Sequence, residues 1–180
     1  MRVFVDADSL PVREREILLR RFSKDDVEAY FVADRTLNDV ERAIEAHTGR
    51  LREGKRDLDR KELKKIRSTI HMVVVEKGDN SADDEIVRIA TSGSIAITHD
   101  VPLAKRLVDN GVVVLDDRGG VYTGENINER LSVRNFMTEL RAQGIKEEKT
   151  KRLTEKDIME FADSFDKIYT KMEKATSCGK

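Results

Sequence analysis

The stretch VFVDADSLPV, residues 3–12, decides how the rest of the chain is interpreted. Its apolar start predicts a buried strand over Arg2–Asp6, and two carboxylates, Asp6 and Asp8, follow where that strand ends. Further apolar runs alternate along the chain with amphipathic stretches typical of helices. The pattern predicts an α/β fold with a mainly parallel sheet. We expect the other strands at Val27–Val32, His71–Val75, Ser94–Thr98 and Val112–Leu115.

Helix signals lie between these strands. Ser9 is a candidate N-cap with Pro11 in the first turn, and Gly49 is expected to end the helix that follows the second strand. Asn80 or Ser81 is expected to cap a middle helix that Gly93 stops. Further helices are expected over Pro102–Asn110, from the cap Thr123 to about Gln143, and over Thr154–Lys174.

A length of 180 residues suits one domain with appendages. We expect a domain over 1–145, with a charged insertion at about 48–70, and a C-terminal helical extension and tail over 146–180. No apolar run approaches the roughly 18 residues of a membrane span. The N-terminus has no apolar signal-peptide core. These features predict a cytoplasmic protein without a membrane partner, and they leave a homodimer open.

The composition limits the chemistry. One cysteine, Cys178, and three histidines exclude a disulfide framework and make a cysteine or histidine metal site improbable. A bound metal would therefore have oxygen ligands, which favours Mg²⁺ or Mn²⁺. The net charge is −1, but residues 50–67 hold nine Lys/Arg against four Asp/Glu. That segment is either a surface for a polyanion or a solvated helical excursion.

Acidic residues follow three of the predicted strands. Because the carboxyl ends of parallel strands meet at one edge of a sheet, we expect these groups to converge there. Each alone could cap a helix or favour a helix dipole, whereas together they repel one another and favour a bound cation. The groups are Asp6 with Asp8, Asp79 with Asp83 and Asp84, and Asp100.

Other site types lack parts. An EF-hand starting at Asp79 would need glycine where Asp84 stands and glutamate where Ala90 stands. The sequence has no Walker glycine loop, GxSxG elbow or GxGxxG motif. Cations that could hold phosphate are available, and Arg118, beside a glycine pair at the same sheet edge, is the best single candidate. The full set is Lys77, Lys105, Arg118, Arg130 and Arg134.

The motifs VDADSLPV, ADDEIV, ITHDVPLA, DDRGGVYTGENINERL and RNFMTELRAQG resemble, in order and spacing, the YaiI/YqxD family of bacterial proteins, which is grouped with PIN-like nuclease domains. The resemblance covers about residues 1–36 and 71–145. It implies a PIN-like three-layer α/β sandwich with C-terminal helices. It also implies acids that bind Mg²⁺ or Mn²⁺ to cut RNA or DNA.

The resemblance carries over residue by residue. Asp6 matches the acid that ends the first strand and Asp8 the second acid there, while Asp83, with Asp84 beside it, matches the acid of the middle helix. Asp100 matches the acid after the fourth strand, supported by Thr98. The glutamate of an early helix has no clear counterpart, although Glu41 or Glu45 could serve. Leu10 and Asn80 stand where the family usually has Cys and Asp.

We therefore predict a metal-dependent phosphodiesterase or nuclease, with single-stranded RNA favoured as the substrate. Asp6, Asp8, Asp83 and Asp100 are the predicted metal ligands, and Asp84 completes the predicted catalytic set. The predicted substrate contacts are Thr98, Lys105, Arg118 and Arg134.

Two rival interpretations stay open. In a haloacid-dehalogenase-like phosphatase, Asp6 would be the nucleophile and Asp8 the acid/base, and GDNSAD, residues 78–83, would be the metal motif. That interpretation gives no role to ITHDVPLA. In a non-catalytic nucleic-acid-binding module, the acids would have no chemical task.

Overall fold

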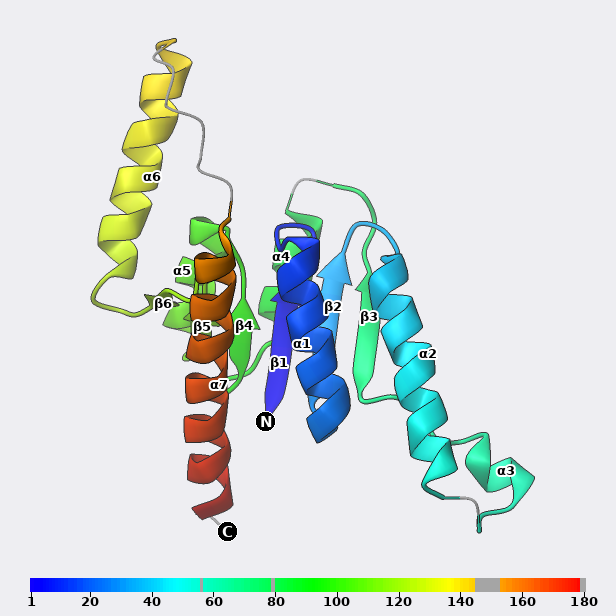
Figure 1. Cartoon of the computed structure of the whole chain (residues 1–180). Coiled ribbons are helices and arrows are strands. Elements are labelled where there is room, and N and C mark those ends of the chain that lie inside the picture. Colours follow the sequence, from blue (N-terminus) through cyan, green and yellow to red (C-terminus); the bar gives the residue numbers. More distant parts are fainter. Residues whose placement is uncertain (56, 79, 145–152, 179–180) are drawn as a thin grey trace.

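The computed structural model describes residues 1–55, 57–78, 80–144 and 153–178 (Figure 1). Its strands are β1 Arg2–Asp6, β2 Glu28–Ala33, β3 Ile70–Val74, β4 Ile95–Ile97, β5 Val113–Leu115 and β6 Val121–Tyr122. Its helices are α1 Val12–Asp25, α2 Asn38–Glu53, α3 Arg60–Leu63, α4 Ser81–Ile89, α5 Val101–Asp109, α6 Ile127–Ala142 and α7 Glu155–Cys178.

The strands form one mostly parallel sheet in the order β3-β2-β1-β4-β5-β6. All neighbouring strands pair in parallel except β5 and β6, which are antiparallel. The predicted α/β fold is confirmed, and the five expected strands lie within a residue or two of their expected positions. The short strand β6 falls where the sequence predicted only a loop, because two residues carry no detectable alternation.

Helices cover both faces of the sheet, which makes three layers (Figure 1). Val3 and Val5 point to one face, where α1, α2 and α7 complete a buried cluster with Phe22 and Phe165. Phe4 points to the other face, where α4 and α5 complete a second cluster. This alternation follows from the two-residue period of a strand. Helix α6 packs against α5 and then extends past the body of the molecule.

The C-terminal helix α7 belongs to the core. Phe161, Phe165 and Tyr169 are at most 5% exposed and lie in the same buried cluster as β1 and α1. The helix starts with reciprocal bonds between Thr154 and Asp157, as the expected start at Thr154 requires. The boundary expected at residues 145 and 146 lies outside the described residues.

Two predicted helix signals are wrong. Ser9 does not cap α1, because its hydroxyl donates to the Asp6 carbonyl oxygen, and Pro11 occupies the N-cap position. Helix α2 continues through Gly49 to Glu53, so that glycine does not end it. Thr123 lies four residues before α6 begins at Ile127, and it starts the turn that leads into the helix: it exchanges two hydrogen bonds with Asn126, and its carbonyl oxygen accepts from the Ile127 amide.

The charged segment after α2 contains the short helix α3, which lies at the far corner of the molecule from α6 and α7 (Figure 1). Its N-cap Asp59 accepts bonds from the amides of Lys61 and Glu62. None of the α3 residues is buried. Among the described residues, no helix combines the length and apolar character needed to cross a bilayer.

Candidate functional site

The topology fixes where a ligand would bind. From β1 the chain winds outward through β2 to β3 with α1 and α2 on one face, and it then returns through α4 to β4 on the other side of β1. The winding therefore reverses between β1 and β4. Open α/β sheets bind ligands at the carboxyl ends of the strands beside such a reversal. Asp6 ends β1, and Thr98 to Asp100 follow β4.

A polar pocket of about 380 Å³ lies at this edge. It draws its walls from the ends of β1, β2 and β4 and from the start of α4. The sequence-predicted acids Asp6, Asp8, Asp83 and Asp100 all line it, as the rule for parallel strands predicted. The other lining residues are Ser9, Asp34, Gly78, Asn80, Ser81 and Ala82.

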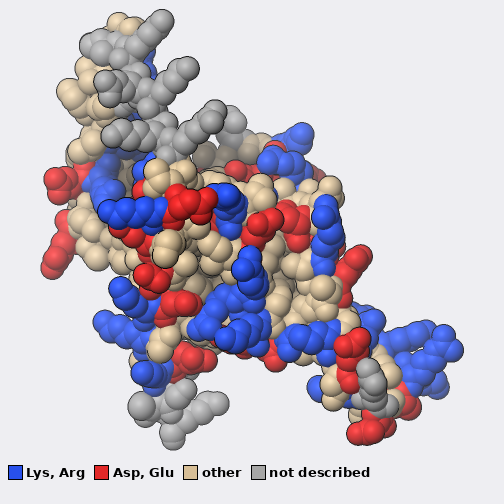
Figure 2. Space-filling model, viewed as in Figure 1, with Lys and Arg blue, Asp and Glu red and all other residues tan. Residues whose placement is uncertain are grey.

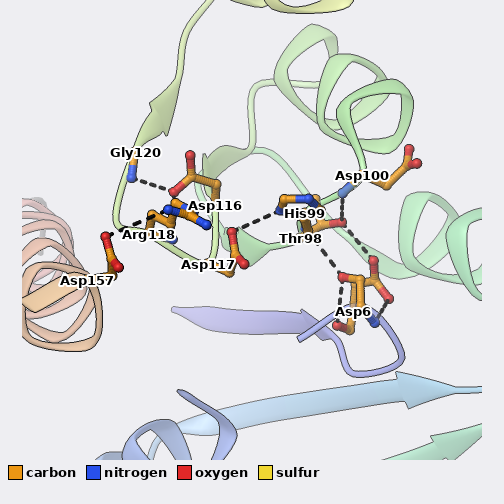
Figure 3. A network of polar contacts seen from close by, with 10 residues as sticks. Asp6, Thr98, His99, Asp100, Asp116, Asp117, Arg118, Gly120 and Asp157 are labelled. Carbon is orange, nitrogen blue, oxygen red and sulfur yellow. Dashed lines mark hydrogen bonds and ion pairs between the residues drawn. The ribbon is translucent and has the colours of Figure 1, made fainter. Parts of the chain in front are cut away.

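Thr98 connects the ends of β1 and β4. Its side chain is fully buried, and its hydroxyl donates to Asp6 Oδ2 at 2.7 Å and accepts from the Asp100 amide at 3.0 Å (Figure 3). Asp6, only 5% exposed, also lies near the Ser9 amide, at 3.4 Å from Oδ1. Thr98 therefore positions two of the predicted acids rather than facing a substrate.

Asp83 is the electrostatic centre of the pocket. Its carboxylate makes no hydrogen bond or ion pair with any described residue, although the residue is half-buried in the first turn of α4. Burial, followed by the negative charges of Asp6 and Asp100, raises the pKa of Asp83 from its ordinary value of 3.8 to about 6. Arg106 lowers the pKa of Asp83 only in part, so the negative charge around this carboxylate is not fully offset by the described residues.

Asp8 and Asp100 are partly engaged. Asp8 Oδ2 accepts from the Asp34 amide at 2.7 Å, and its Oδ1 lies 3.2 Å from Arg35. Asp100 caps α5 by accepting from the Leu103 amide at 2.9 Å. Capping was one of the two interpretations offered for Asp100, so the residue combines a structural bond with a place in the pocket.

The predicted cations separate into two groups. Arg134 on α6 does not line the pocket, but it lies 3.5 Å from Oδ2 of Asp100, which does. Lys105 pairs with Asp109 on the same helix at 2.5 Å, and Arg118 lies 3.8 Å from Asp157 on α7. Neither lines the pocket. Arg130 lies over the Tyr122 ring.

Asp84 also lies outside the pocket. It is exposed and pairs with Arg106 on α5 at 2.8 Å. Successive helical residues point about 100° apart, so Asp83 and Asp84 could not both face the same pocket. Glu41 lines a different pocket beside β3. Asp79 lies outside the described residues.

A second polar network continues from the pocket towards α7 (Figure 3). His99 Nδ1 lies 2.9 Å from Asp117, which is 7% exposed, and this hydrogen bond raises the pKa of His99. The neighbouring Asp116 accepts from the amides of Arg118 and Gly120 and so holds the β5–β6 turn. No motif in the sequence predicted a role for His99, Asp116 or Asp117.

Glu14 is buried beside this network. It is fully buried, and neither carboxylate oxygen has a hydrogen-bond partner among the described residues. Burial is the main cause of its raised pKa, and the charge of Asp117 adds to it. A single sequence does not show which side of a helix an isolated acid such as Glu14 occupies.

The sequence did contain a signal for Asp34. This residue directly follows β2, as Asp6 ends β1 and Asp100 follows β4, so the rule for parallel strands applies to it equally. Its carboxylate lines the pocket, and its amide holds Asp8. Ser81, at the start of α4, could have been found from its place beside the acids of that helix.

The donor chemistry of the pocket fits Mg²⁺ or Mn²⁺, which prefer carboxylate oxygens. Among the described residues, however, no three His, Cys, Asp or Glu side chains are grouped closely enough to enclose a metal ion. Mg²⁺ commonly retains several waters and uses one or two carboxylates. The unpaired Asp83 beside Asp6 and Asp100 suits that hydrated mode, not a closed cage.

The chain has relatives among known proteins. The family model described as "Uncharacterized BCR, YaiI/YqxD family" matches residues 58–171. A UPF0178 protein of Treponema denticola is 35% identical over 95% of this chain and 93% of its own. Others from Treponema pallidum and Desulfotalea psychrophila are each 37% identical over 96% of this chain, covering 83% and 99% of their own lengths.

No solved structure matches the chain. The family model covers more than half of the sequence, and the relatives align over nearly all of it. The chain therefore belongs to the YaiI/YqxD family.

Proposed function

We propose that this protein is a metal-dependent phosphodiesterase that acts on nucleic acid, with single-stranded RNA as the favoured substrate. The proposal includes placing the fold among PIN-like nuclease domains. What supports this is the combination of a parallel α/β sheet with acids at its carboxyl edge. Three of the motifs that resemble the YaiI/YqxD family, VDADSLPV, ADDEIV and ITHDVPLA, supply the acids at that edge.

The observation that carries the proposal is the charge around Asp83. Three carboxylates from separate elements, Asp6, Asp83 and Asp100, interact closely enough that the first and last raise the pKa of the middle one. No described cation pairs with Asp83, and Arg106 only partly offsets the effect. A divalent cation would relieve this repulsion. Structural capping alone would not require the carboxylates to share a pocket.

In this proposal Asp83 and either Asp6 or Asp100 contact a hydrated ion directly, the remaining one of the pair acts on it through its charge or a bound water, and Asp8 lies at the rim with Asp34. A bound divalent ion supplies a polarised phosphoryl oxygen and a water of lowered pKa. Thr98 fixes the orientations of Asp6 and Asp100 through its two hydrogen bonds. Arg134 lies beside Asp100, where it can hold a phosphate oxygen.

The test is cleavage of a labelled single-stranded RNA in Mn²⁺ by the wild type and by Asp6→Asn and Asp100→Asn. We expect the wild type to cleave and both variants to lose at least about a hundredfold in rate, since each removes a charge that holds the ion. The control is Asp84→Asn, because Asp84 pairs with Arg106 outside the pocket. That variant should retain most of the activity.

Two results would contradict the proposal. A phosphoaspartyl intermediate trapped on Asp6, with hydrolysis of a phosphate monoester, would establish the phosphatase alternative. Tight RNA binding with neither cleavage nor dependence on a divalent metal would establish the binding-module alternative.

A further inference from the structure

A second surface of unusual charge lies between α1 and α7. The two helices run side by side in the same direction, with Arg13 paired to Glu155 near their N-terminal ends and Arg21 to Asp166 further along. A pocket of about 260 Å³ opens between the two helices, and a second of about 530 Å³ lies along α7 alone; the two meet at Asp166 and are together called the α1–α7 groove. This α1–α7 groove lies towards the end of the molecule opposite the carboxyl edge (Figure 1).

The groove concentrates positive charge. Six cations line it, three from each helix: Arg20, Arg21, Lys24, Lys167, Lys171 and Lys174. In Figure 2 blue side chains lie over the lower part of the α1 and α7 face, with red side chains among them. In a chain with a net charge of −1, this accumulation is local and does not reflect the overall composition.

Most of these charges lack a counter-ion. Of the six cations, only Arg21 makes an ion pair with a described residue, to Asp25 at 2.8 Å and to Asp166 at 3.1 Å. Asp166 is the only acid that lines the groove. Cations elsewhere in the described chain, such as Arg42 and Lys61, also make no ion pair with a described residue, so the grouping of six cations around one acid is what distinguishes the groove. The groove therefore keeps like charges together at a cost in repulsion that a bound anion would remove.

Arg21 adds a donor without an acceptor. Its guanidinium lies over the Tyr169 ring, 5.4 Å from the centroid, and its Nε is buried. Although Asp166 Oδ1 is 3.1 Å away, Nε has no hydrogen-bond partner with suitable geometry among the described residues. Buried donors are normally satisfied, so this one favours a ligand that brings an acceptor oxygen.

The length of the groove indicates several phosphates rather than one. Lys167 and Lys174 are seven residues apart, which is about 10 Å along a helix at 1.5 Å per residue. Between the helices, Ile17 and Ala162 provide an apolar floor that suits sugar and base faces. No exposed aromatic ring lines the described pockets, so contacts to the backbone dominate and base sequence is not read.

We propose that the α1–α7 groove binds the phosphate backbone of a single-stranded nucleic acid at a site separate from the carboxylate pocket. The choice of nucleic acid as the polyanion rests on the proposed function. The groove acts as an anchor: it raises the affinity for long strands and takes no part in cleavage.

The test is binding of a fluorescently labelled single-stranded RNA 20-mer by the full chain in EDTA, followed by anisotropy over a series of salt concentrations. The variant is Arg20→Gln with Lys171→Gln, one charge from each helix. Each lost phosphate contact lowers the slope of log K against log salt by about 0.7 for single strands, so the slope should fall by about 1.4. The affinity should fall most at low salt.

The matched control is Arg88→Gln with Lys156→Gln, which also removes two exposed positive charges but from pairs outside the groove. It should leave the slope unchanged. Arg20→Lys with Lys171→Arg keeps both charges and should bind as the wild type does. Thermal melting of all three variants confirms that they fold.

Equal slopes for the groove variant and the matched control would overturn the proposal. The proposal would also be overturned if polyglutamate displaced the labelled RNA as strongly as unlabelled RNA of equal charge does. The groove would then fit an acidic protein equally well. Hydrolysis of a small phosphodiester in Mn²⁺ tests the carboxylate pocket independently. If the groove variant binds RNA less well and the wild type does not hydrolyse the diester, the groove proposal stands and the proposed function is contradicted. If the wild type hydrolyses the diester and the groove variant keeps the wild-type salt slope, the proposed function stands and the groove proposal is contradicted.

Discussion

Thr98 shows how much of the site depends on one buried hydroxyl. Its hydroxyl donates a hydrogen bond to the carboxylate of Asp6, which ends β1, and accepts one from the backbone amide of Asp100, which follows β4. It therefore joins two strands at the point where the winding reverses. The sequence assigned Thr98 to substrate contact, whereas its complete burial makes it a positioning residue. Burial of a small polar side chain cannot be read from a single sequence.

Thr98→Val should lower the free energy of unfolding by about 1–3 kcal/mol, because it leaves Asp6 Oδ2 and the Asp100 amide without their partner. Urea denaturation measures this loss. Thr98→Ser keeps the hydroxyl and should lose clearly less. Equal losses for valine and serine would show that the methyl group, and not the hydrogen bonds, stabilises this position.

Asp83 predicts a pH dependence of stability in the metal-free protein. Its pKa is about 6 in the folded state against an ordinary value of 3.8, so the folded state binds the proton more tightly than the unfolded state does. Its contribution to stability is therefore present below about pH 4 and is lost as the pH rises through 6. Asp83→Asn should be more stable than the wild type at pH 7, and this advantage should shrink towards pH 4.

Urea denaturation of both proteins in EDTA at pH 4, 5, 6 and 7 measures that difference. Asp84→Asn is the control, since Asp84 is exposed and paired with Arg106. A difference between wild type and Asp83→Asn that stays constant with pH would contradict the assigned pKa.

Topology alone was enough to predict that Asp6 and Asp100 lie together at one edge of the sheet, because they adjoin the ends of parallel strands. The same argument applies to Asp34. To predict which of Asp83 and Asp84 lines the pocket, one must know how α4 is rotated about its axis, and the sequence does not give that rotation. Placing Lys105 and Arg118 needs their partners, Asp109 and Asp157.

At the scale of elements, the segment that was expected to be a C-terminal extension contributes a helix, α7, to the core. Phe165 is 1% exposed and packs edge-on against Phe22 at 5.7 Å between ring centroids, with Tyr169 at 5.8 Å on another side. The helix itself was predicted from apolar residues at steps of three and four. Its place on the sheet could not be predicted, because that pattern does not name the surface that it covers.

Phe165→Ala should therefore lower the free energy of unfolding by about 3–5 kcal/mol through lost burial and a residual cavity. The Met159 side chain lies on the same helix and is 67% exposed. Met159→Ala should therefore change the free energy of unfolding by no more than about 0.5 kcal/mol. Thermal and urea denaturation compare the two. A small effect at Phe165 would mean that α7 is not a stable part of the core.

At the scale of the whole molecule, the alternation of strands and helices was enough to predict a mainly parallel sheet, and the family resemblance implied the layers. It was not enough to predict the surface. The sequence indicated one basic segment, at 50–67, because its charges are consecutive. The α1–α7 groove was missed, because its charges come from helices that are more than a hundred residues apart in the chain.

The basic segment makes its own prediction. Replacing Arg60, Lys61, Lys64 and Lys65 with glutamine should weaken RNA binding and reduce its salt dependence, by up to about 0.7 in slope per contact removed. These side chains are exposed, so the variant should melt as the wild type does. Anisotropy titrations over a salt series measure the slope. An unchanged slope would mean that the segment is the solvated excursion that its composition equally allows.

The central claim is that the carboxylates at the switch between β1 and β4 share a divalent ion. The most direct measurement is a crystal structure of the protein soaked in Mn²⁺, with anomalous scattering to locate the metal. We predict a peak in the pocket within about 2.0–2.3 Å of oxygens from Asp83 and from Asp6 or Asp100, with waters completing the shell. A saturated crystal with an open pocket and no peak there, or with Mn²⁺ bound only elsewhere, would contradict the claim.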